Sequence, residues 1–370
     1  MVPVALGLQR CSGYNLSRRF VETGSVALEG DLQFRVLSWN VLAQDYIVWA
    51  GVPAGAKAAY SWRARRPLLL AQVARLDPDI FALQELEVSV FRNEVKPWAK
   101  SIGFDGYFAG APVGISLFWR LSTFRSVTAV HADLGDMSWS PRFSSSKLTL
   151  SEDQFRRYID RPFRTALFVT LVPTHARRHA LVVSTTHLDP AVHANPVNLD
   201  VQVFQAERVM EALTDIVAAT GARTDEYDSV SALLVGDFNA PPHYPHSMVQ
   251  ALQYKIKHGE MPPGGRSGGS GAAPGPLVLV RSPVYELLVT GRLSHSSVVL
   301  QCMALQADGR PLSLLLGDLL NAQWELALRS AHMEALGEEP PTCQDETLDY
   351  VLYWPGRDGG RLALLGTLEP

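Results

Sequence analysis

Short apolar runs separated by polar segments recur along the chain, and each run has the length of a buried strand. Strands are predicted from Phe34 to Asn40 and at Ile80 to Leu83, Gly114 to Trp119, Ala166 to Leu171, Ala180 to Thr185, Ser231 to Val235 and Thr347 to Leu352. Two longer stretches, Ser61 to Leu76 and Asp200 to Ala219, carry apolar residues at helical spacing and predict helices. The core-facing positions of these helices are Trp62, Leu69, Val73 and Leu76, and Val201, Phe204, Val209 and Leu213. Because strands and helices alternate without internal repeats, the pattern predicts a single α/β fold.

Polar residues stand at or near the ends of five of these predicted strands. In chain order they are Asn40, Glu85, His187, the pair Asp237 and Asn239, and Asp349. Each one alone has a structural explanation, such as a turn Asn, a solvated Glu or a core His satisfied by backbone. Five such positions in one chain are poorly explained by coincidence. They predict a polar site where the strand ends converge.

The segment LVGDFNAPP is the most informative of these strand ends. We expect Gly236 to let the chain turn where the strand ends. The Asp-x-Asn spacing places Asp237 and Asn239 on the same side of an extended backbone. One side chain can then orient a water while the other donates hydrogen bonds to an oxyanion. The alternative is an Asx turn that closes the strand.

Glu85 offers a hard oxygen ligand at the end of its strand. Mg²⁺ is commonly bound by one or two carboxylates together with waters and substrate phosphates, so Glu85 is a candidate ligand. Asn40 is of a residue type that is unusual within strands, and its carboxamide can reach a metal or a phosphate.

The order and wording of these segments resemble the endonuclease/exonuclease/phosphatase superfamily, and within it the branch of nocturnin, Angel and carbon-catabolite-repressor deadenylases. The matching strings are WN, LQE, THL, GDFN and LDY, with VLSWNVLAQ, Trp62 and Arg65 ahead of a helix, VGISLFWRLSTF, DVQVFQ, SPVYELLVTGRL, and RSAH followed by GEEPPT. The resemblance covers residues 33–370, so we expect one catalytic domain there and an N-terminal extension at residues 1–32. Residues 262–276 are rich in Gly, Pro and Ser and are expected to form a mobile insertion.

The resemblance implies a four-layered α/β sandwich, in which two mixed β-sheets pack face to face with helices on the outside. It implies Mg²⁺, or alternatively Mn²⁺, held at Asn40 and Glu85. Asp237 would orient or deprotonate the attacking water, and Asn239 and His187 would bind the scissile phosphate.

Asp349 would orient a catalytic His in the same scheme. Arg65 and Arg164 are further candidates for substrate binding.

The largest departure from the family follows Asp349. The family carries a Ser-Asp-His motif on a final strand, whereas this chain reads RLALLGTLEP and has no His beyond Asp349. We therefore expect a domain that lacks its last strand, leaving an unpaired sheet edge and a buried carboxylate without its partner. A truncated sequence is the favoured explanation, and loss of activity is the alternative.

Smaller departures fall on segments that are expected to line the substrate side. Val113 stands where the family has Asp, Thr185 where it has Asn, and Arg164 and Thr165 where an Asn-containing dipeptide is usual. These departures leave base and sugar preference open.

Charge limits the kind of nucleic-acid contact. A formal net charge of -4 excludes a protein that coats nucleic acid by bulk electrostatics, so RNA contact should be local. Residues 141–180 carry eight basic and three acidic residues with aromatic residues among them. This composition suits a phosphate-tracking groove, and a solvated loop is the alternative.

The compartment is constrained only weakly. No run of about 18 apolar residues is present, so no membrane span is predicted. Three isolated cysteines suit a reducing compartment, and we expect a cytoplasmic protein. Arg10, Arg18 and Arg19 give the first twenty residues a faint transit-peptide composition, so mitochondrial import is an alternative, as is the nucleus.

The predicted function is metal-assisted hydrolysis at the 3′ end of RNA, as in a deadenylase. The expected partner is a single-stranded RNA end or a nucleotide and not a DNA duplex, and the oligomeric state is left open. Alternatives are a nucleotide or cyclic-phosphate phosphatase and a catalytically impaired homologue that binds RNA or protein. A sphingomyelinase-type phospholipase C ranks last, because that enzyme usually adds membrane segments.

Overall fold

The computed structural model describes residues 3–5, 20–23, 25, 32–47, 57–135, 164–190, 199–245, 279–293, 324–342, 348–357 and 362–368. The predicted insertion at residues 262–276 and residues 141–163 of the basic segment lie outside the described residues.

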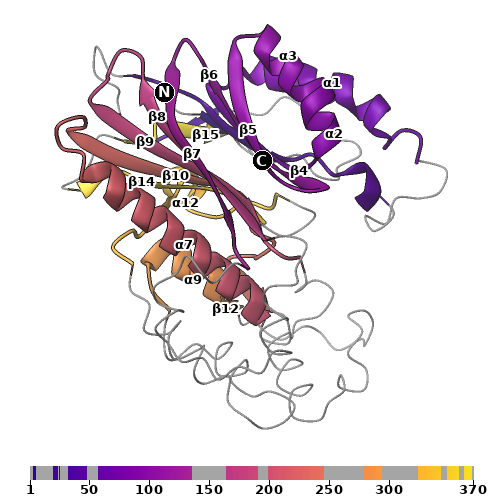
Figure 1. Ribbon diagram of the computed structural model, residues 1–370. Helices are drawn as coiled ribbons and strands as arrows, with labels where there is room; N and C mark the ends of the chain where they lie inside the picture. Colours follow the sequence, from indigo (N-terminus) through magenta and orange to yellow (C-terminus); the bar gives the residue numbers. More distant parts are fainter. Residues whose placement is uncertain are drawn as a thin grey trace, which may run out of the picture.

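Two β-sheets form the centre of the described molecule (Figure 1). The larger sheet has seven strands in the order β2-β15-β1-β3-β4-β6-β5. In chain order these strands are β1 (Pro3–Ala5), β2 (Phe20–Glu22), β3 (Val36–Asn40), β4 (Ile80–Glu87), β5 (Phe104–Gly110), β6 (Val113–Arg120) and β15 (Gly366–Leu368). Strand β3 pairs in parallel with β1 and β4, whereas β6 runs antiparallel to β4, so the sheet is mixed.

The second sheet has six strands in the order β13-β14-β10-β9-β8-β7. They are β7 (Phe124–Asp133), β8 (Thr165–Pro173), β9 (His179–His187), β10 (Ser229–Asp237), β13 (Arg329–Ser330) and β14 (Asp349–Trp354). This sheet is also mixed, because β10 runs parallel to β9 and antiparallel to β14. A separate two-stranded ribbon joins β11 (His243–Pro245) to β12 (Leu279–Arg281).

Helices cover the outer faces of both sheets (Figure 1). Those of the first half are η1 (Gln44–Tyr46), α1 (Trp62–Leu76), α2 (Val88–Val90), the π-helical segment η3 (Phe91–Val95) and α3 (Lys96–Ser101). Those of the second half are α7 (Leu199–Gly221), α9 (Pro283–Thr290) and α12 (Ala331–Leu336). Helices α1 and α3 pack on the seven-stranded sheet, and α7 and α9 pack on the six-stranded sheet.

Alternating side chains explain why the layers stack in this way. In β10, Leu233 and Val235 belong to the core between the sheets, and Ala232 and Leu234 belong to the core under α7. Successive strand side chains point to opposite faces, so a strand buried on both faces needs a continuous apolar run. The predicted four-layered sandwich, with helices outside two mixed sheets, is confirmed.

The two predicted helices form with nearly the expected bounds. Helix α1 is capped by Ser61, whose side chain accepts a hydrogen bond from the Ala64 amide, and it ends at Asp77 in the left-handed conformation. Helix α7 begins one residue before the predicted start, at Leu199, and ends at Gly221.

The C-terminal residues bear on one prediction. Gly366–Leu368 form β15, which pairs with β1 and β2, and β1 in turn pairs with β3. The sequence predicted an unpaired sheet edge without locating it; among the described residues, β1, β3 and β15 each have a partner strand on both sides. Strand β15 carries no His.

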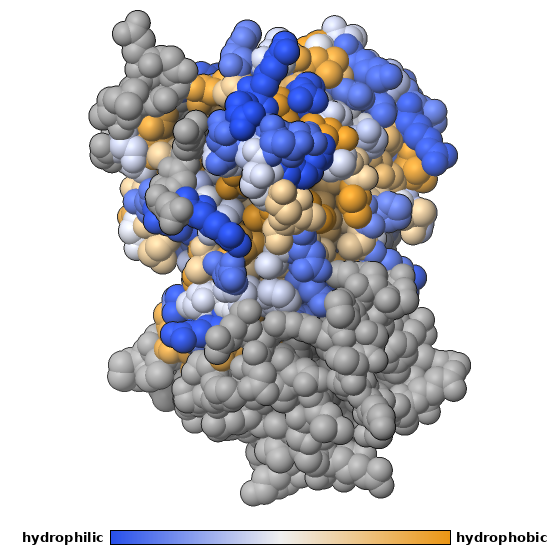
Figure 2. Space-filling model, turned by 60° about the vertical axis from the view of Figure 1, so that its left-hand side comes forward, coloured by the Kyte–Doolittle hydropathy of each residue, from blue (hydrophilic) through white to orange (hydrophobic). Residues whose placement is uncertain are grey.

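In the part of the chain that the structure describes, no helix combines the length and the apolar character needed to cross a membrane. On the described portion of the face in Figure 2, hydrophilic and hydrophobic residues are interspersed.

Candidate active site

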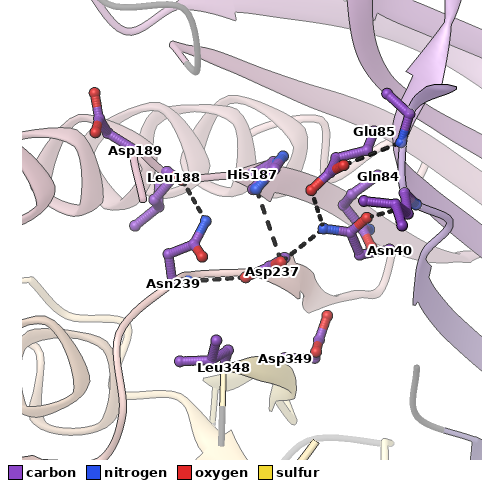
Figure 3. Close-up of polar contacts among 12 residues, drawn as sticks. Asn40, Gln84, Glu85, His187, Leu188, Asp189, Asp237, Asn239, Leu348 and Asp349 are labelled. Carbon is purple, nitrogen blue, oxygen red and sulfur yellow. Dashed lines mark hydrogen bonds and ion pairs between the residues drawn. The ribbon is translucent and has the colours of Figure 1, made fainter. Parts of the chain in front are cut away.

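The inward faces of both sheets change from apolar to polar at one end. Asp237 continues the inward row of Leu233 and Val235 in β10. It lies directly opposite His187 on one side and Asp349 on the other. In the facing sheet, Asn40 lies opposite Gln84. The predicted strand-end residues therefore converge at one place (Figure 3).

Asn40 connects the two sheets at this place. Its Nδ2 donates to Glu85 Oε1 at 2.7 Å and to Asp237 Oδ2 at 2.8 Å. His187 Nε2 lies 3.7 Å from the same Asp237 oxygen. Asn40, His187 and Asp237 are each at most 5% exposed, so these contacts are formed in a largely dehydrated setting.

A β-bulge turns Glu85 into the site. Strict alternation from Ile80, Ala82 and Gln84 would send Glu85 to the outer face. The register between β4 and β6 shifts between Leu83 and Leu86, and Glu85 has a positive φ of 55°. This left-handed residue in the bulge re-aims the carboxylate toward Asn40.

Asp237 and Asn239 form the expected Asx turn and also face the site. Asp237 Oδ1 accepts a hydrogen bond from the Asn239 amide at 2.9 Å, and Asn239 Nδ2 donates to the Leu188 carbonyl at 2.8 Å. Asn239 is left-handed, with φ 48°. The alternative prediction of an Asx turn is therefore confirmed, the predicted extended backbone ends at Asp237, and the catalytic roles of both residues stay predictions.

Gly236 has a different role from the predicted turn. It lies inside β10, which continues to Asp237. A Cβ at this position would lie 2.1 Å from the Thr186 carbonyl oxygen of β9. The predicted turn was wrong, because the strand continues; the glycine is required by the close approach of a neighbouring backbone and by its own φ of 149°.

Asp349 is the least satisfied group of the site. Within the described structure its Oδ1 is buried and has no hydrogen-bond partner. Burial raises the pKa of Asp349 well above its usual range, and the negative charges of Asp237 and Glu85 raise it further. A side-chain hydrogen bond with Thr342 opposes this rise.

Comparison with known proteins identifies the family. The profile described as the endonuclease/exonuclease/phosphatase family matches residues 37–360. The chain belongs to this family. Nucleases of the family generally use a divalent metal ion.

Curated relatives include two of the expected branch. The Ccr4 subunit of the CCR4-Not complex from Saccharomyces cerevisiae, a 3′-5′-exoribonuclease, is 27% identical over 91% of this chain and 35% of its own length. Protein angel homolog 2 from Homo sapiens is 22% identical over 92% of this chain and 63% of its own length. The matches to four curated relatives span 54%, 35%, 28% and 60% of those proteins' own lengths.

Two solved structures share the fold. ANGEL2, a 2′,3′-cyclic phosphatase, aligns over 96% of this chain and 91% of that chain, with a TM-score of 0.56 and 20% identity. The human Nocturnin catalytic domain, solved with a bound sulfate anion, aligns over 91% of this chain and 86% of that chain, with a TM-score of 0.51 and 19% identity.

The carboxylates of this family member fit a divalent cation. Glu85 Oε1 and Asp237 Oδ2 both accept a hydrogen bond from Asn40 Nδ2, and Asp349 lies opposite Asp237 on the neighbouring strand. Among the described residues, no three His, Cys, Asp or Glu side chains form a group that could hold a metal by themselves. A Mg²⁺ ion bound through a single carboxylate, waters and substrate phosphate matches both observations.

Glu85 fits the role of metal ligand better than Asn40 does. Asn40 presents Nδ2 to the two carboxylates, and its Oδ1 accepts from the Leu42 amide at 3.0 Å. An amide nitrogen is a donor and not a ligand, so the predicted role of Asn40 as a direct ligand does not fit this orientation. Asn40 instead holds Glu85 and Asp237 in place.

The two predicted substrate arginines differ. Arg65 donates from three guanidinium nitrogens to the backbone carbonyls of Tyr60, Val41 and Leu42, which gives it a structural role, and its contact with substrate stays a prediction. Arg164 lies just before β8, at the end of the sheet that contains His187, and its Nε lies 3.1 Å from Asp133 Oδ1. Its side chain is 38% exposed, and its role in substrate binding stays a prediction.

A buried polar layer below the site was missed from sequence. Gln84 Nε2 lies 3.2 Å from Ser38 Oγ and 3.1 Å from Thr185 Oγ1, and all three residues are fully buried. The sequence predicted that Thr185 lines the substrate side. This prediction is wrong, because its hydroxyl is buried against Gln84. The available signal was strand parity, since Ser38 and Gln84 share the inward rows of Val36 and Ile80.

Proposed function

We propose that this chain is a metal-dependent phosphoesterase that shortens single-stranded RNA from its 3′ end. The observation that carries the proposal is the double hydrogen bond of Asn40, which joins the candidate ligand Glu85 of one sheet to the candidate base Asp237 of the other. The 3′-5′-exoribonuclease activity named for the yeast relative supports RNA as the substrate class.

Glu85 would hold Mg²⁺, with Mn²⁺ as a substitute. When bound, the ion supplies a positive charge that stabilises the charge developing on the phosphoryl group. Glu85 suits this task because it is only partly buried, while Asn40 and the Ala43 amide fix its two carboxylate oxygens.

Asp237 would orient the attacking water and accept its proton. Its Oδ2 already accepts a hydrogen bond from Asn40 Nδ2, and its Oδ1 accepts one from the Asn239 amide. The carboxylate is therefore fixed in one orientation. A positioned carboxylate of this kind typically contributes about 10²–10⁴-fold as a general base.

His187 and Asn239 would donate hydrogen bonds to phosphate oxygens. Asn239 Nδ2 has two hydrogens, and the Leu188 carbonyl takes one of them. Such donors act on the charge that develops in the transition state. Asp349 is assigned no direct step in this scheme; its buried carboxyl lies on the strand position opposite Asp237.

A second candidate is removal of a 2′,3′-cyclic phosphate from an RNA end. It is favoured by protein angel homolog 2, which matches 92% of this chain, and by the fold shared with the 2′,3′-cyclic phosphatase ANGEL2. The same groups would serve, because both reactions transfer a phosphoryl group to water.

The test uses four substrates with Mg²⁺ and with EDTA. They are a 5′-labelled oligo(A), an RNA of mixed sequence, the same RNA ending in a 2′,3′-cyclic phosphate, and NADPH. We expect shortening of both linear RNAs from the 3′ end, and the Asp237→Asn variant should be inactive. Opening of the cyclic phosphate without shortening would replace the exoribonuclease by the second candidate, and phosphate release from NADPH alone would indicate a nucleotide phosphatase. Inertness toward all four would instead favour a binding protein.

A further inference from the structure

We propose that Arg65 is a positioning residue that holds the metal ligand Glu85, and the Asn40 side chain beside it, through the backbone of residues 41–43. The inference rests on the proposed function for its catalytic consequence, but its structural basis is independent of the substrate.

The Arg65 guanidinium spans two separate stretches of backbone. Nε donates to the Tyr60 carbonyl at 2.6 Å, Nη2 donates to the Leu42 carbonyl at 2.8 Å, and Nη1 donates to the Val41 carbonyl. The guanidinium group is planar and holds its N–H donors in a fixed geometry. Its three contacts therefore fix the position of residues 41 and 42 relative to residue 60.

The segment that Arg65 holds is the one that orients the site. The Leu42 amide donates to Asn40 Oδ1 at 3.0 Å, and the Ala43 amide donates to Glu85 Oε2 at 3.0 Å. A shift of this short segment would therefore move both side chains together. Among the described residues, the hydrogen bonds of Arg65 go to backbone carbonyls and to neither of these two side chains.

The local conformation needs an external restraint. Leu42 has a φ of 57°, and a non-glycine residue in the left-handed region persists only when its surroundings enforce it. Among the described residues, four non-glycine residues have positive φ, and three of them, Leu42, Glu85 and Asn239, lie at this site. Arg65 bonds the carbonyl of one of these three.

Electrostatics suits this position as well. Burial lowers the pKa of Arg65, while the negative charges of Glu85 and Glu87 raise it. The guanidinium stays charged, since its ordinary pKa lies far above neutrality. Arg65 thus brings a positive charge near Glu85 and Glu87 in addition to its hydrogen bonds with the backbone.

The start of helix α1 completes the frame. The Trp62 amide donates to Gln44 Oε1 at 2.6 Å, and the Gln44 amide donates to Glu87 Oε1 at 2.8 Å. The first turn of α1 is therefore tied to strand β4 through the loop, and Arg65 is the side chain of that turn that reaches residues 41 and 42.

The test compares Arg65→Lys and Arg65→Gln with a matched control, Arg66→Lys. Arg66 is the next residue of the same helix, is 45% exposed, and pairs with Glu94 at 3.0 Å. Lysine at position 65 keeps the charge but cannot bridge three carbonyls, so this variant separates geometry from charge. Three quantities are measured: Mn²⁺ binding by the full chain, urea unfolding in EDTA, and kcat and KM for oligo(A) at several Mg²⁺ concentrations.

We expect both Arg65 variants to bind Mn²⁺ about 10–100-fold more weakly, as for other residues that orient a metal ligand. At saturating Mg²⁺ the KM for oligo(A) should be unchanged in Arg65→Lys, and Arg66→Lys should match the wild type throughout. If Arg65→Gln fails to fold, Arg65→Lys alone decides the question. A raised KM with unchanged Mn²⁺ affinity would show that Arg65 contacts substrate, and unchanged values of both would show that the loop holds itself; each result overturns the proposal.

The two proposals fail in different ways. A wild-type chain that cleaves no RNA but loses Mn²⁺ affinity on Arg65→Lys would overturn the proposed function and support the positioning role. If the wild-type chain cleaves RNA and Arg65→Lys leaves Mn²⁺ affinity unchanged, the proposed function is supported and the positioning role is overturned.

Discussion

The two sheets contribute halves of the site that are stabilised very differently. On the seven-stranded side, both Glu85 oxygens accept hydrogen bonds, one from Asn40 and one from the Ala43 amide. On the six-stranded side, Asp349 lies opposite Asp237 and leaves its Oδ1 without a partner in the described structure. In one half the carboxylate is satisfied by one side-chain amide and one backbone amide, and the other half contains two neighbouring acids.

The two halves therefore differ in how their carboxyl groups affect the stability of the folded protein. A carboxylate bonded to backbone amides is held in place at little cost. A buried acid beside another acid destabilises the folded protein unless it keeps its proton. The seven-stranded half should therefore respond to mutation mainly in metal binding, and the six-stranded half mainly in stability.

The largest effect is expected from Gly236→Ala in the six-stranded half. The new Cβ would lie 2.1 Å from the Thr186 carbonyl oxygen, which belongs to a paired strand and cannot move alone. We expect a loss of at least about 3 kcal/mol in the free energy of unfolding, measured with urea. Gly337→Ala is the control, because Gly337 has a φ of 78° but no atom within 4 Å of the new Cβ. Its cost should be about 1 kcal/mol, and equal costs for the two variants would refute the close-approach argument.

Next in size is the loss of metal dependence in Glu85→Gln. Glutamine keeps the shape of the side chain but removes the charge, so activity should fall at least about 100-fold and Mg²⁺ should no longer raise the melting temperature. Stability in EDTA should change by less than about 1 kcal/mol. Glu87→Gln serves as control, since Glu87 lies two residues later in β4 and accepts the Gln44 amide instead. An unchanged Mg²⁺ titration in Glu85→Gln would remove Glu85 as the ligand.

Asp349→Asn should stabilise the protein, and more so at higher pH. Because the folded pKa of Asp349 is raised above its unfolded value of about 3.9, the wild type loses stability as pH rises between these two values. The slope is at most about 1.4 kcal/mol per pH unit, and asparagine has no proton to lose. In EDTA the variant should exceed the wild type by about 1 kcal/mol or more near about pH 8, and the two should converge near about pH 4.

Asp105→Asn is the control for this pH series. Asp105 is 40% exposed and lies 3.7 Å from Lys96, so its neutralisation removes a surface ion pair that is worth at most about 1 kcal/mol. A pH-independent difference for Asp349→Asn would mean that the carboxyl binds its proton equally well in the folded and unfolded states, against the raised pKa.

The smallest effect compares two helix caps. Ser61 caps α1 on the seven-stranded side, and Ser282 caps α9 on the six-stranded side. Each Ser→Ala change should cost about 1 kcal/mol of stability. Only Ser61→Ala should also weaken Mn²⁺ binding, by a few-fold, because the first turn of α1 carries Arg65. Equal Mn²⁺ affinity in the two variants would show that the position of residues 41–43 does not depend on the cap of α1.

Much of the layered fold could be predicted because burial on both faces imposes continuous apolar runs. The strands that carry Asn40, Glu85, His187, Asp237 and Asn239 were found in this way, and the polar residues at their ends converge. The pairing of β1 with β15 had no such signal, since each strand has three residues.

The local geometry of the site could not be derived from pattern alone. Parity sends Glu85 outward, and only the register shift against β6 reverses it. Gly236 resembles a turn residue until Thr186 is placed beside it. Arg65 resembles a free cation until the loop carbonyls of residues 41 and 42 are known. In each case the decisive neighbour is distant in sequence, so periodicity carries no information about it.

The hydrogen bond from Asn40 to Asp237 joins residues 197 positions apart in the chain. Closing so long a loop is an entropic cost that only the docking of the two sheets can offset. Non-local contacts of this kind slow folding, so the site should be among the last features to form. Ligand binding at this point should consequently stabilise the whole domain as one cooperative unit, and amides deep in both sheets should gain hydrogen-exchange protection together when the site is filled.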